Sequence, residues 1–193
     1  MRNKLPMKKF VLNLLRSNLP PNYFYHNPEH TIYVHEKAME IGRFEGCTEE
    51  ELKLLSIAAL WHDTGLTKVY KHHEDESCVM ARKYLSENGY LIEDIDRICC
   101  IIMATQLPQQ PQDKLGEIIA DADLEYLGTA CFETVSNTLF KELQSMNPSL
   151  TRACWNQMQI SFLQKHKYFT RFCKENREPL KQIYLNKLLQ VLE

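Results

Sequence analysis

The chain has 193 residues, of which 44% are hydrophobic and 25% are charged, and these proportions exclude disordered and low-complexity proteins. Its 23 Lys and Arg residues nearly balance 25 Asp and Glu residues, for a formal net charge of −2, so the sequence lacks the basic excess of a nucleic-acid-binding protein. No segment approaches the roughly 20 consecutive apolar residues that a membrane-spanning helix needs. We therefore expect a globular protein whose partners include neither nucleic acid nor a membrane.

The N-terminus and the cysteines indicate the compartment. The first apolar stretch, Phe10 to Leu15, is short, contains Asn13 and is followed by no small-residue cleavage site, so we predict no signal peptide. The chain has 7 Cys and no Cys-x-x-Cys pair. We expect reduced thiols in the core, a role that we favour over redox chemistry for the adjacent Cys99 and Cys100. The expected location is the cytoplasm.

Helical signals follow one another along the chain, whereas no alternating strand pattern exceeds about four residues. Asn27-Pro28-Glu29 combines an N-cap residue, a proline at the first helical position and an early acid. Thr48 and Glu51 form a capping box at the start of another helix. We predict one all-α domain over residues 1–193, with helices at about Met7–Ser17, Asn27–Gly46, Thr48–Asp63, Glu74–Gly89, Ile92–Thr105, Leu115–Gln144, Leu150–Lys165 and Arg177–Leu192.

Two histidines lie on the apolar faces of predicted helices. His62 follows Leu55 by seven residues, which places it on the apolar face of its helix, and Asp63 comes next at the helix end. His30 precedes Val34 by four residues and lies in the first turn of its own helix. Because ionisable groups are costly to bury without a partner, both histidines are candidate functional residues.

Two acids end the apolar segment that begins at Leu115. At 100° per residue, Asp123 lies about 40° from Ile119, at the edge of the apolar face, whereas Asp121 points away from that face. Residues two positions apart on a helix do not face the same side. We therefore predict that Asp123 is the inward acid and that Asp121 supports a neighbour or lies at the surface.

His30, His62, Asp63 and Asp123 allow two interpretations. Two imidazoles and two carboxylates in an apolar bundle suit a metal site with mixed nitrogen and oxygen ligands, and helical bundles commonly hold such sites between facing helices. Alternatively, each histidine is a hydrogen-bonded core residue and each aspartate is an N-cap or a surface group. The pattern by itself favours neither interpretation.

The order of these residues resembles the H…HD…D pattern of the HD superfamily of metal-dependent phosphohydrolases, in particular small stand-alone predicted members. The similarity covers about residues 22–177. Its further features are Tyr25-His26-Asn27 before His30-Thr31, Ala58-Ala59-Leu60-Trp61 before the HD pair and Thr64-Gly65 after it, His73-Glu74 with Ser77, Asp121-Ala-Asp-Leu-Glu-Tyr-Leu-Gly128, and Trp155, Phe162, His166, Tyr168 and Thr170.

The resemblance implies an all-α HD-type helical bundle with a motif core at about residues 22–130 and a helical extension at about 131–193. It also implies that one divalent ion, of Mn, Fe, Co, Ni or Mg, has open positions for water and substrate. Thr105 stands where members with two metals carry a further histidine, so we expect a single ion. The implied ligands of that ion are His30, His62, Asp63 and Asp123.

Three residues make up the predicted catalytic set. Asp63 suits the role of proton acceptor for a metal-activated water. His73 is predicted to hold substrate phosphate or a second ion, although surface histidines are common at such loop-to-helix junctions. Lys68 is predicted to neutralise phosphate, with a solvated cation as the alternative. His26 either orients a ligand or packs with a satisfied hydrogen bond, and His166 is expected at the surface.

We predict an enzyme that hydrolyses a phosphate ester or anhydride of a small metabolite, with nucleotides among the candidates, by metal-activated water. The alternative is a regulatory module that keeps the bundle and binds a nucleotide without turnover. The complete ligand set favours the enzyme, since binding alone does not need all four residues. The sequence leaves open the substrate, the native metal and whether the chain forms a homo-oligomer.

Overall fold

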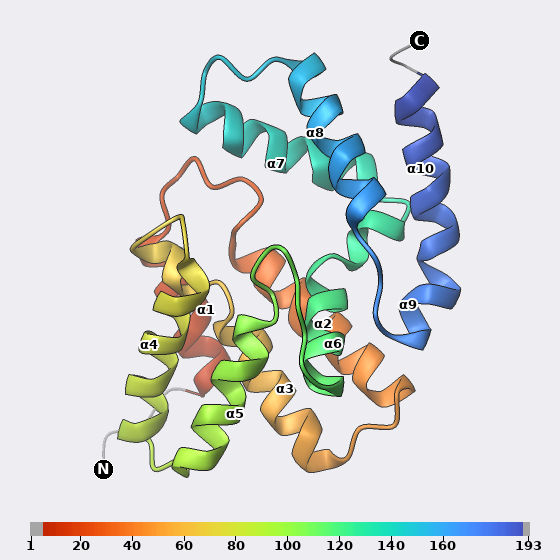
Figure 1. The fold of residues 1–193 in the computed structure, drawn as a ribbon. Helices are drawn as coiled ribbons and strands as arrows, with labels where there is room; N and C mark the ends of the chain where they lie inside the picture. The colour runs from red at the N-terminus through yellow and green to blue at the C-terminus, as the bar shows by residue number, and fades with distance from the viewer. Residues whose placement is uncertain (1–5, 191–193) are drawn as a thin grey trace.

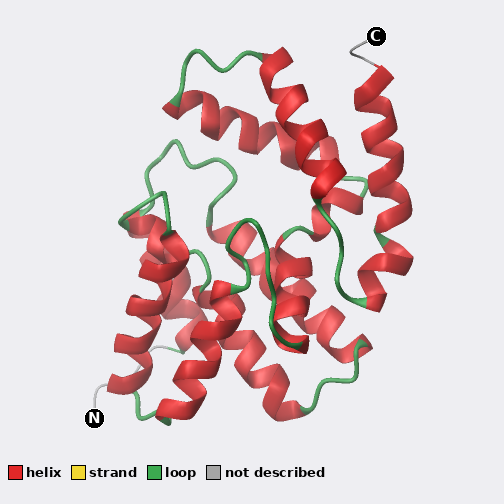
Figure 2. Cartoon of the chain, in the orientation of Figure 1, coloured by secondary structure: helices red, strands yellow, loops and turns green. Residues whose placement is uncertain are grey.

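The computed structural model describes residues 6–190, and within that range the chain consists of helices and loops with no strand (Figure 1). Figure 2 shows the same arrangement coloured by secondary structure, and the predicted all-α fold is confirmed. The predicted end of the last helix, at residues 191–192, lies outside the described part. The elements are α1 (Met7–Asn18), α2 (Pro28–Phe44), α3 (Glu49–Trp61), the 3-10 turn η1 (Thr64–Thr67), α4 (His73–Glu87), α5 (Ile92–Met103), α6 (Lys114–Asp123), the 3-10 turn η2 (Glu125–Gly128), α7 (Phe132–Met146), α8 (Arg152–Lys165), α9 (Arg171–Asn176) and α10 (Glu178–Gln190).

Side-chain caps begin the two helices that lead to the histidines. The Asn27 side chain accepts a hydrogen bond from the His30 amide at 2.9 Å, and Pro28 occupies the first position of α2. At α3, Thr48 Oγ1 accepts from the Glu51 amide at 3.2 Å, and Glu51 Oε2 accepts from the Thr48 amide at 2.8 Å. Both predicted caps are confirmed, and the first of them fixes His30 in the first turn of α2.

Helices α1 to α6 form a bundle that we call the core bundle. Helices α2, α3 and α6 pack against one another at its centre (Figure 1). Their contacting faces consist of small and branched apolar residues, so the helices approach closely. His30 lies in the first turn of α2, at the start of its buried face, whereas the buried faces of α3 and α6 lead to His62 and Asp123. These three residues therefore meet at one end of the bundle. The buried residues of the faces include Val34, Ala38, Ile41, Leu55, Ala58, Ala59, Ile118 and Ile119.

The turn after α3, which contains Asp63 and Gly65, packs closely against the backbone of α4. Gly65 has no side chain, and a Cβ atom at this position would overlap the backbone oxygen of His73. The Gly65 amide donates to Ser77 Oγ at 2.8 Å, and the Ser77 hydroxyl donates to the His62 carbonyl at 2.6 Å. These contacts fix His62, Asp63 and His73 on one corner of the bundle.

The prediction of a single helix over Leu115–Gln144 is wrong, because the chain turns in the middle of this segment and forms α6, η2 and α7 (Figure 1). Gly128 lies so close to the Arg177 backbone that a Cβ atom would overlap it. Glu125, in the same turn, is fully buried and accepts hydrogen bonds from Tyr33 and Arg177. These long-range contacts interrupt the helix and direct α7 away from the core bundle.

The adjacent residues Cys99 and Cys100 differ in exposure. Cys99 is buried as predicted, but Cys100 is exposed, because successive helical residues lie about 100° apart and only one of the two faces the core. Of the helices within residues 6–190, none combines the length and the apolar character needed to cross a membrane.

The C-terminal extension is fastened to the core through Asp121. This residue is fully buried, so the alternative that it lies at the surface is wrong. Its carboxylate accepts hydrogen bonds from the Phe169 amide at 2.9 Å, the Thr170 amide at 2.8 Å and the Thr170 hydroxyl at 2.6 Å. The loop before α9 therefore covers the side of α6 that faces away from α2 and α3.

We expect Asp121→Ala to lower the free energy of unfolding by about 2–4 kcal/mol, because it leaves three buried donors without an acceptor. Burial raises the pKa of Asp121 to about 6, against the effect of these donors, so the comparison belongs at about pH 8, where the carboxyl is ionised. Urea titrations followed by circular dichroism measure the change. Asp121→Asn keeps an acceptor oxygen and should lose less stability. Wild-type stability in the alanine variant would contradict the anchoring role.

His166 is half-buried because α10 packs over it, whereas we predict it at the surface. Its ring contacts Tyr168 edge to face, with centroids 4.7 Å apart, and its Nδ1 lies 3.3 Å from Lys181 Nζ. Lys181 is 1% exposed, donates to the His166 carbonyl at 2.8 Å and pairs with Glu178 at 2.9 Å. Burial, and then repulsion from Lys181, lower the pKa of His166 to about 4. The imidazole is therefore neutral in the folded protein at neutral pH.

Acidification should destabilise the protein through His166. The unfolded chain takes up a proton on this residue near pH 6.5, whereas the folded protein resists protonation down to about pH 4. The contribution to stability is thus complete above pH 6.5 and is lost as the pH falls toward 4. In urea titrations with EDTA present, wild type should lose more unfolding free energy between about pH 7.5 and pH 5 than His166→Gln. Equal losses would show that the imidazole titrates freely.

Candidate metal centre

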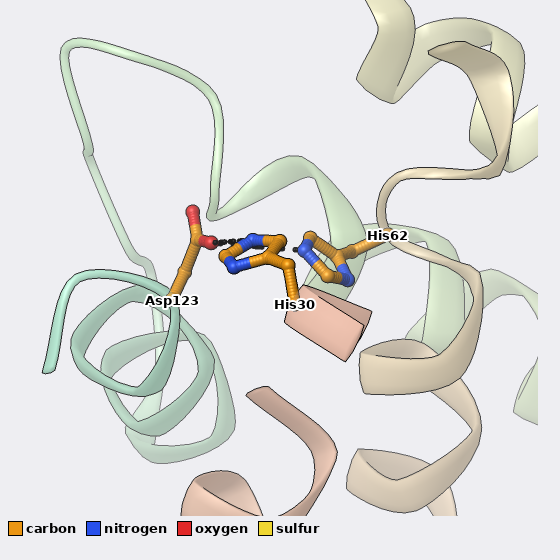
Figure 3. Close-up of side chains that lie close together, drawn as sticks. All are labelled: His30, His62 and Asp123. Carbon is orange, nitrogen blue, oxygen red and sulfur yellow. Dashed lines mark hydrogen bonds and ion pairs between the residues drawn. The ribbon is translucent and has the colours of Figure 1, made fainter. Parts of the chain in front are cut away.

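The predicted ligands meet at one end of the core bundle. Figure 3 shows His30 from α2, His62 from the end of α3 and Asp123 from α6 pointing toward one another. Asp123 Oδ1 lies 3.0 Å from His30 Nε2 and 3.6 Å from His62 Nε2. The donor atoms of the three residues all lie within 4.8 Å of one another, a spacing that a single metal ion can bridge.

His62 is oriented as a ligand by its own helix. Its Nδ1 lies 2.9 Å from the carbonyl oxygen of Ala59. Since a carbonyl only accepts, Nδ1 carries a proton, and Nε2 is the atom available to a metal. This Nε2 is buried and has no hydrogen-bond partner among the described residues. A buried polar atom without a partner is costly, and a bound cation would satisfy it.

Asp63 joins the cluster through one oxygen and contacts His73 through the other. Its Oδ2 lies 3.3 Å from His62 Nε2 and 3.5 Å from His30 Nε2, and it too is buried without a hydrogen-bond partner in the described part of the chain. Its Oδ1 lies 3.2 Å from His73 Nε2. The cluster therefore contains two imidazoles and two carboxylates, a donor set that fits a divalent ion.

The buried charges of the cluster shift one another's pKa values. Burial opposes ionisation, yet His62 holds the pKa of Asp63 well below its usual range, and His30 together with His62 does the same for Asp123. Burial also opposes the charge on His62, but Asp63 and Asp123 raise the pKa of His62 well above its ordinary value. The two carboxylates thus stay ionised and require positive charge nearby. A divalent ion meets that requirement and competes with the imidazole proton.

His73 lies beside the cluster, as the sequence predicts. Its Nδ1 lies 3.1 Å from the Tyr70 carbonyl, so the ring donates there and directs Nε2 toward Asp63. Burial lowers the pKa of His73, but the hydrogen bond to Asp63 and the charges of Asp63 and Glu74 outweigh burial and raise the pKa to about 8. A cationic imidazole at this place suits contact with an anionic group next to the metal.

Lys68 is not brought to the cluster. Its side chain is 56% exposed, and its Nζ lies 2.5 Å from Glu76 Oε1. It is also absent from the lining of the cavity that adjoins the cluster. The geometry gives no support to its predicted catalytic role, and Lys68 has no part in the function proposed below. His72 is exposed as well, because the left-handed backbone at this residue turns its side chain away from the corner that holds His73.

The site contains one charged residue that the sequence analysis missed, Glu142 of α7. It is fully buried, and its carboxylate accepts hydrogen bonds from the Tyr25 amide at 2.8 Å, the His26 amide at 3.0 Å and the Tyr70 hydroxyl at 3.3 Å. It also pairs with His26 Nδ1. Burial opposes the charge, but these bonds, led by that of His26, lower the pKa of Glu142. The extension thus reaches the site and fixes His26, whose ring centroid lies 6.0 Å from that of His73.

Comparisons with known proteins agree with this geometry. No curated protein sequence matches the chain. Among solved structures, the crystal structure of a predicted HD superfamily hydrolase from an uncultured Thermotogales bacterium is similar over 100% of this chain and 97% of that chain, with a TM-score of 0.61 and 21% sequence identity. Similarity at this level of identity supports the fold. The family model described as HD domain matches residues 28–125, just over half of the chain, and this segment contains all four predicted ligands. The chain therefore belongs to the HD domain family, whose members are usually metal-dependent hydrolases.

Proposed function

We propose that this protein is a metal-dependent phosphohydrolase that cleaves a phosphate ester or anhydride of a small metabolite. The observation that carries the proposal is the convergence of four donor groups at one end of a cavity, where Asp63 also contacts His73. An ion-binding cluster with a cationic imidazole beside it suits phosphoryl chemistry better than it suits a purely structural metal site. The proposed partner is a small phosphorylated molecule, with nucleotides among the candidates.

His30, His62, Asp63 and Asp123 would hold one divalent ion, and these donors favour Mn, Fe, Co or Ni over Mg. Such an ion supplies Lewis-acid polarisation of a phosphoryl oxygen and acidifies a water molecule. The Asp63 carboxylate would accept a proton as the water oxygen bonds to phosphorus and the bond to the leaving oxygen breaks. His73 would exchange its contact with Asp63 Oδ1 for a charge-assisted hydrogen bond from Nε2 to the phosphoryl group, and would so orient that group toward the attacking water. The proton is then returned to the leaving oxygen.

Phosphate release provides the test. Metal-stripped protein is incubated with a panel of nucleotides, sugar phosphates and simple phosphate monoesters, with Mn²⁺, Co²⁺, Ni²⁺ or Mg²⁺ added in turn. We expect release that requires one of these ions and stops when EDTA is added. His73→Asn, which keeps a hydrogen-bonding side chain but loses the positive charge, should lower kcat by about 10²–10⁴-fold. Binding of a nucleotide without any release would favour the regulatory module instead.

A further inference from the structure

A cavity of about 390 Å³ adjoins the metal centre. Asp63, His73 and Asp123 contribute to its lining from the core bundle, and Trp155 and Phe162 contribute from α8. Figure 1 shows α7 and α8 above the core bundle, at the end where the ligand-bearing helices meet. The volume falls within the usual range of small-molecule pockets, about 300–1,000 Å³. A molecule bound here would have one end at the metal cluster and the remainder against the extension.

The lining that η2, α7 and α8 supply is largely apolar. Met158 of α8 and Leu107, from the loop before α6, line the cavity although they are 49% and 57% exposed. Large apolar side chains left exposed next to a pocket are typical of an entrance for an apolar ligand. The apolar lining from these three elements includes Leu127, Phe132, Leu139, Leu143, Phe162 and Leu163.

The charges of the cavity are confined to the metal end. Apart from tyrosines, the ionisable residues of its lining are two histidines and three acids, and the lining includes no Lys or Arg. Glu74 is one of these acids, and its Oε1 lies 3.7 Å from His73 Nε2. A second phosphate or a carboxylate placed under α7 and α8 would meet no positive charge, and burying such a group unpaired is costly. The cavity therefore suits a ligand with a single phosphate, bound at the metal.

Most of the polar side chains farther along the cavity already have partners within the protein, whereas Trp155 Nε1 is buried without a hydrogen-bond partner among the described residues. The Ser136 hydroxyl donates to the Gln159 side-chain oxygen, and the Gln159 amide nitrogen lies 3.5 Å from Asn156 Oδ1. The Thr105 hydroxyl donates to the Ile102 carbonyl at 2.8 Å. A sugar or a nucleobase carries several donors and acceptors that would lose water here and gain few partners. The organic part of the ligand is therefore apolar.

We infer that the substrate is a phosphate monoester of a bulky apolar alcohol, an inference that rests on the proposed function for its reaction. The phosphate lies at the metal centre and the hydrocarbon part lies under α7 and α8. Water and the monoester give inorganic phosphate and the free alcohol: the water oxygen bonds to phosphorus, the ester P–O bond breaks, and one proton passes to the departing alkoxide oxygen. The alcohol has no charge, so it leaves through the apolar entrance beside Leu107 and Met158.

Straight-chain alkyl compounds of increasing length test the inference in two ways. Binding of non-hydrolysable alkylphosphonates, from ethyl to decyl, is measured by calorimetry in the presence of Mn²⁺. Turnover of the matching alkyl phosphates is measured by phosphate release. We expect affinity and kcat/KM to rise by up to about fourfold per methylene, the ratio that corresponds to the transfer of one methylene out of water, until the cavity is filled.

A pair of exposed apolar residues provides matched variants. Met158→Gln places an amide at the cavity and should weaken the binding of octylphosphonate more than that of ethylphosphonate. Ile183→Gln changes an α10 residue that is 50% exposed and does not line the cavity, so it should leave both affinities at wild-type values. Both changes are at exposed positions, where substitutions rarely disturb folding.

The outcomes separate the inference from the proposed function. Affinity that rises with chain length, without phosphate release from any compound, would support the apolar ligand and overturn the phosphohydrolase. Metal-dependent release from nucleotides or sugar phosphates, together with alkylphosphonate affinities that do not rise with length, would support the phosphohydrolase and overturn the apolar substrate. A steep chain-length series that Met158→Gln and Ile183→Gln alter equally would also overturn the assignment of this cavity.

Discussion

Asp123→Asn should reduce metal-dependent phosphate release by more than about 10³-fold, whereas Asp121→Asn should keep measurable activity, within about 10–100-fold of wild type. The asparagine at residue 123 has the same shape as aspartate but lacks its charge, and Asp123 Oδ1 lies 3.0 Å from His30 Nε2 at the centre of the cluster. Loss of the Asp123 carboxylate would remove both the ion and the water that the ion activates. Asp121 lies two residues away but contacts Phe169 and Thr170 of the extension instead.

The comparison between these two acids needs folded protein. Circular dichroism of both variants should show wild-type helical content, and the assays should run well below the thermal midpoint of Asp121→Asn. Activity in Asp123→Asn together with an inactive but folded Asp121→Asn would mean that α6 presents the other acid to the metal. The ligand set proposed above would then be wrong.

Protein purified without chelator should contain close to one transition-metal ion per chain, and His62→Ala should contain less than about a tenth of that. His62 Nε2 is buried, lacks a hydrogen-bond partner in the described structure and is aimed at the cluster by the bond from Nδ1 to Ala59. Because loss of a group that merely orients a ligand costs about 10–100-fold in metal affinity, loss of the ligand itself should cost more. Elemental analysis after dialysis measures the difference.

A matched control for the metal measurement is His35→Ala. His35 lies on α2, as His30 does, but its Nε2 lies 2.8 Å from Ser56 Oγ and does not belong to the cluster. This variant should retain the metal content of wild type. Equal metal in wild type and His62→Ala would remove His62 from the ligand set, and equal loss in both variants would point to a general effect on folding.

The helix starts could be predicted from the sequence because they depend on local rules, whereas the ligand set follows from the resemblance to the HD superfamily. Asn27 and Thr48 cap their helices through residues within three positions, and helical periodicity alone separates Asp123 from Asp121. The same periodicity would have identified Glu142, which lies seven residues after Val135 on the apolar face of α7.

Other features depend on contacts between distant parts of the chain and leave no local pattern. The turn at Gly128 exists because the backbone of Arg177 passes against it, and these residues are far apart in the sequence. Asp121 is buried by the loop that precedes α9, and His166 is partly covered by Lys181 of α10. Sequence distance alone puts Lys68 near the site, but its charge is paired with Glu76 of α4.

The division of the site between two stretches of sequence has an evolutionary consequence. The family match ends at residue 125, and it contains every metal-ligand candidate, whereas much of the apolar cavity lining comes from residues 127–163. Substitutions or exchanges in the later stretch would change which molecule is accepted and leave the inherited chemistry intact. Glu142 limits that freedom, because any replacement for α7 must still offer an acceptor to the amides of Tyr25 and His26. Under the function proposed above, selection on substrate choice and selection on catalysis would act on almost separate sets of positions, with this one carboxylate subject to both.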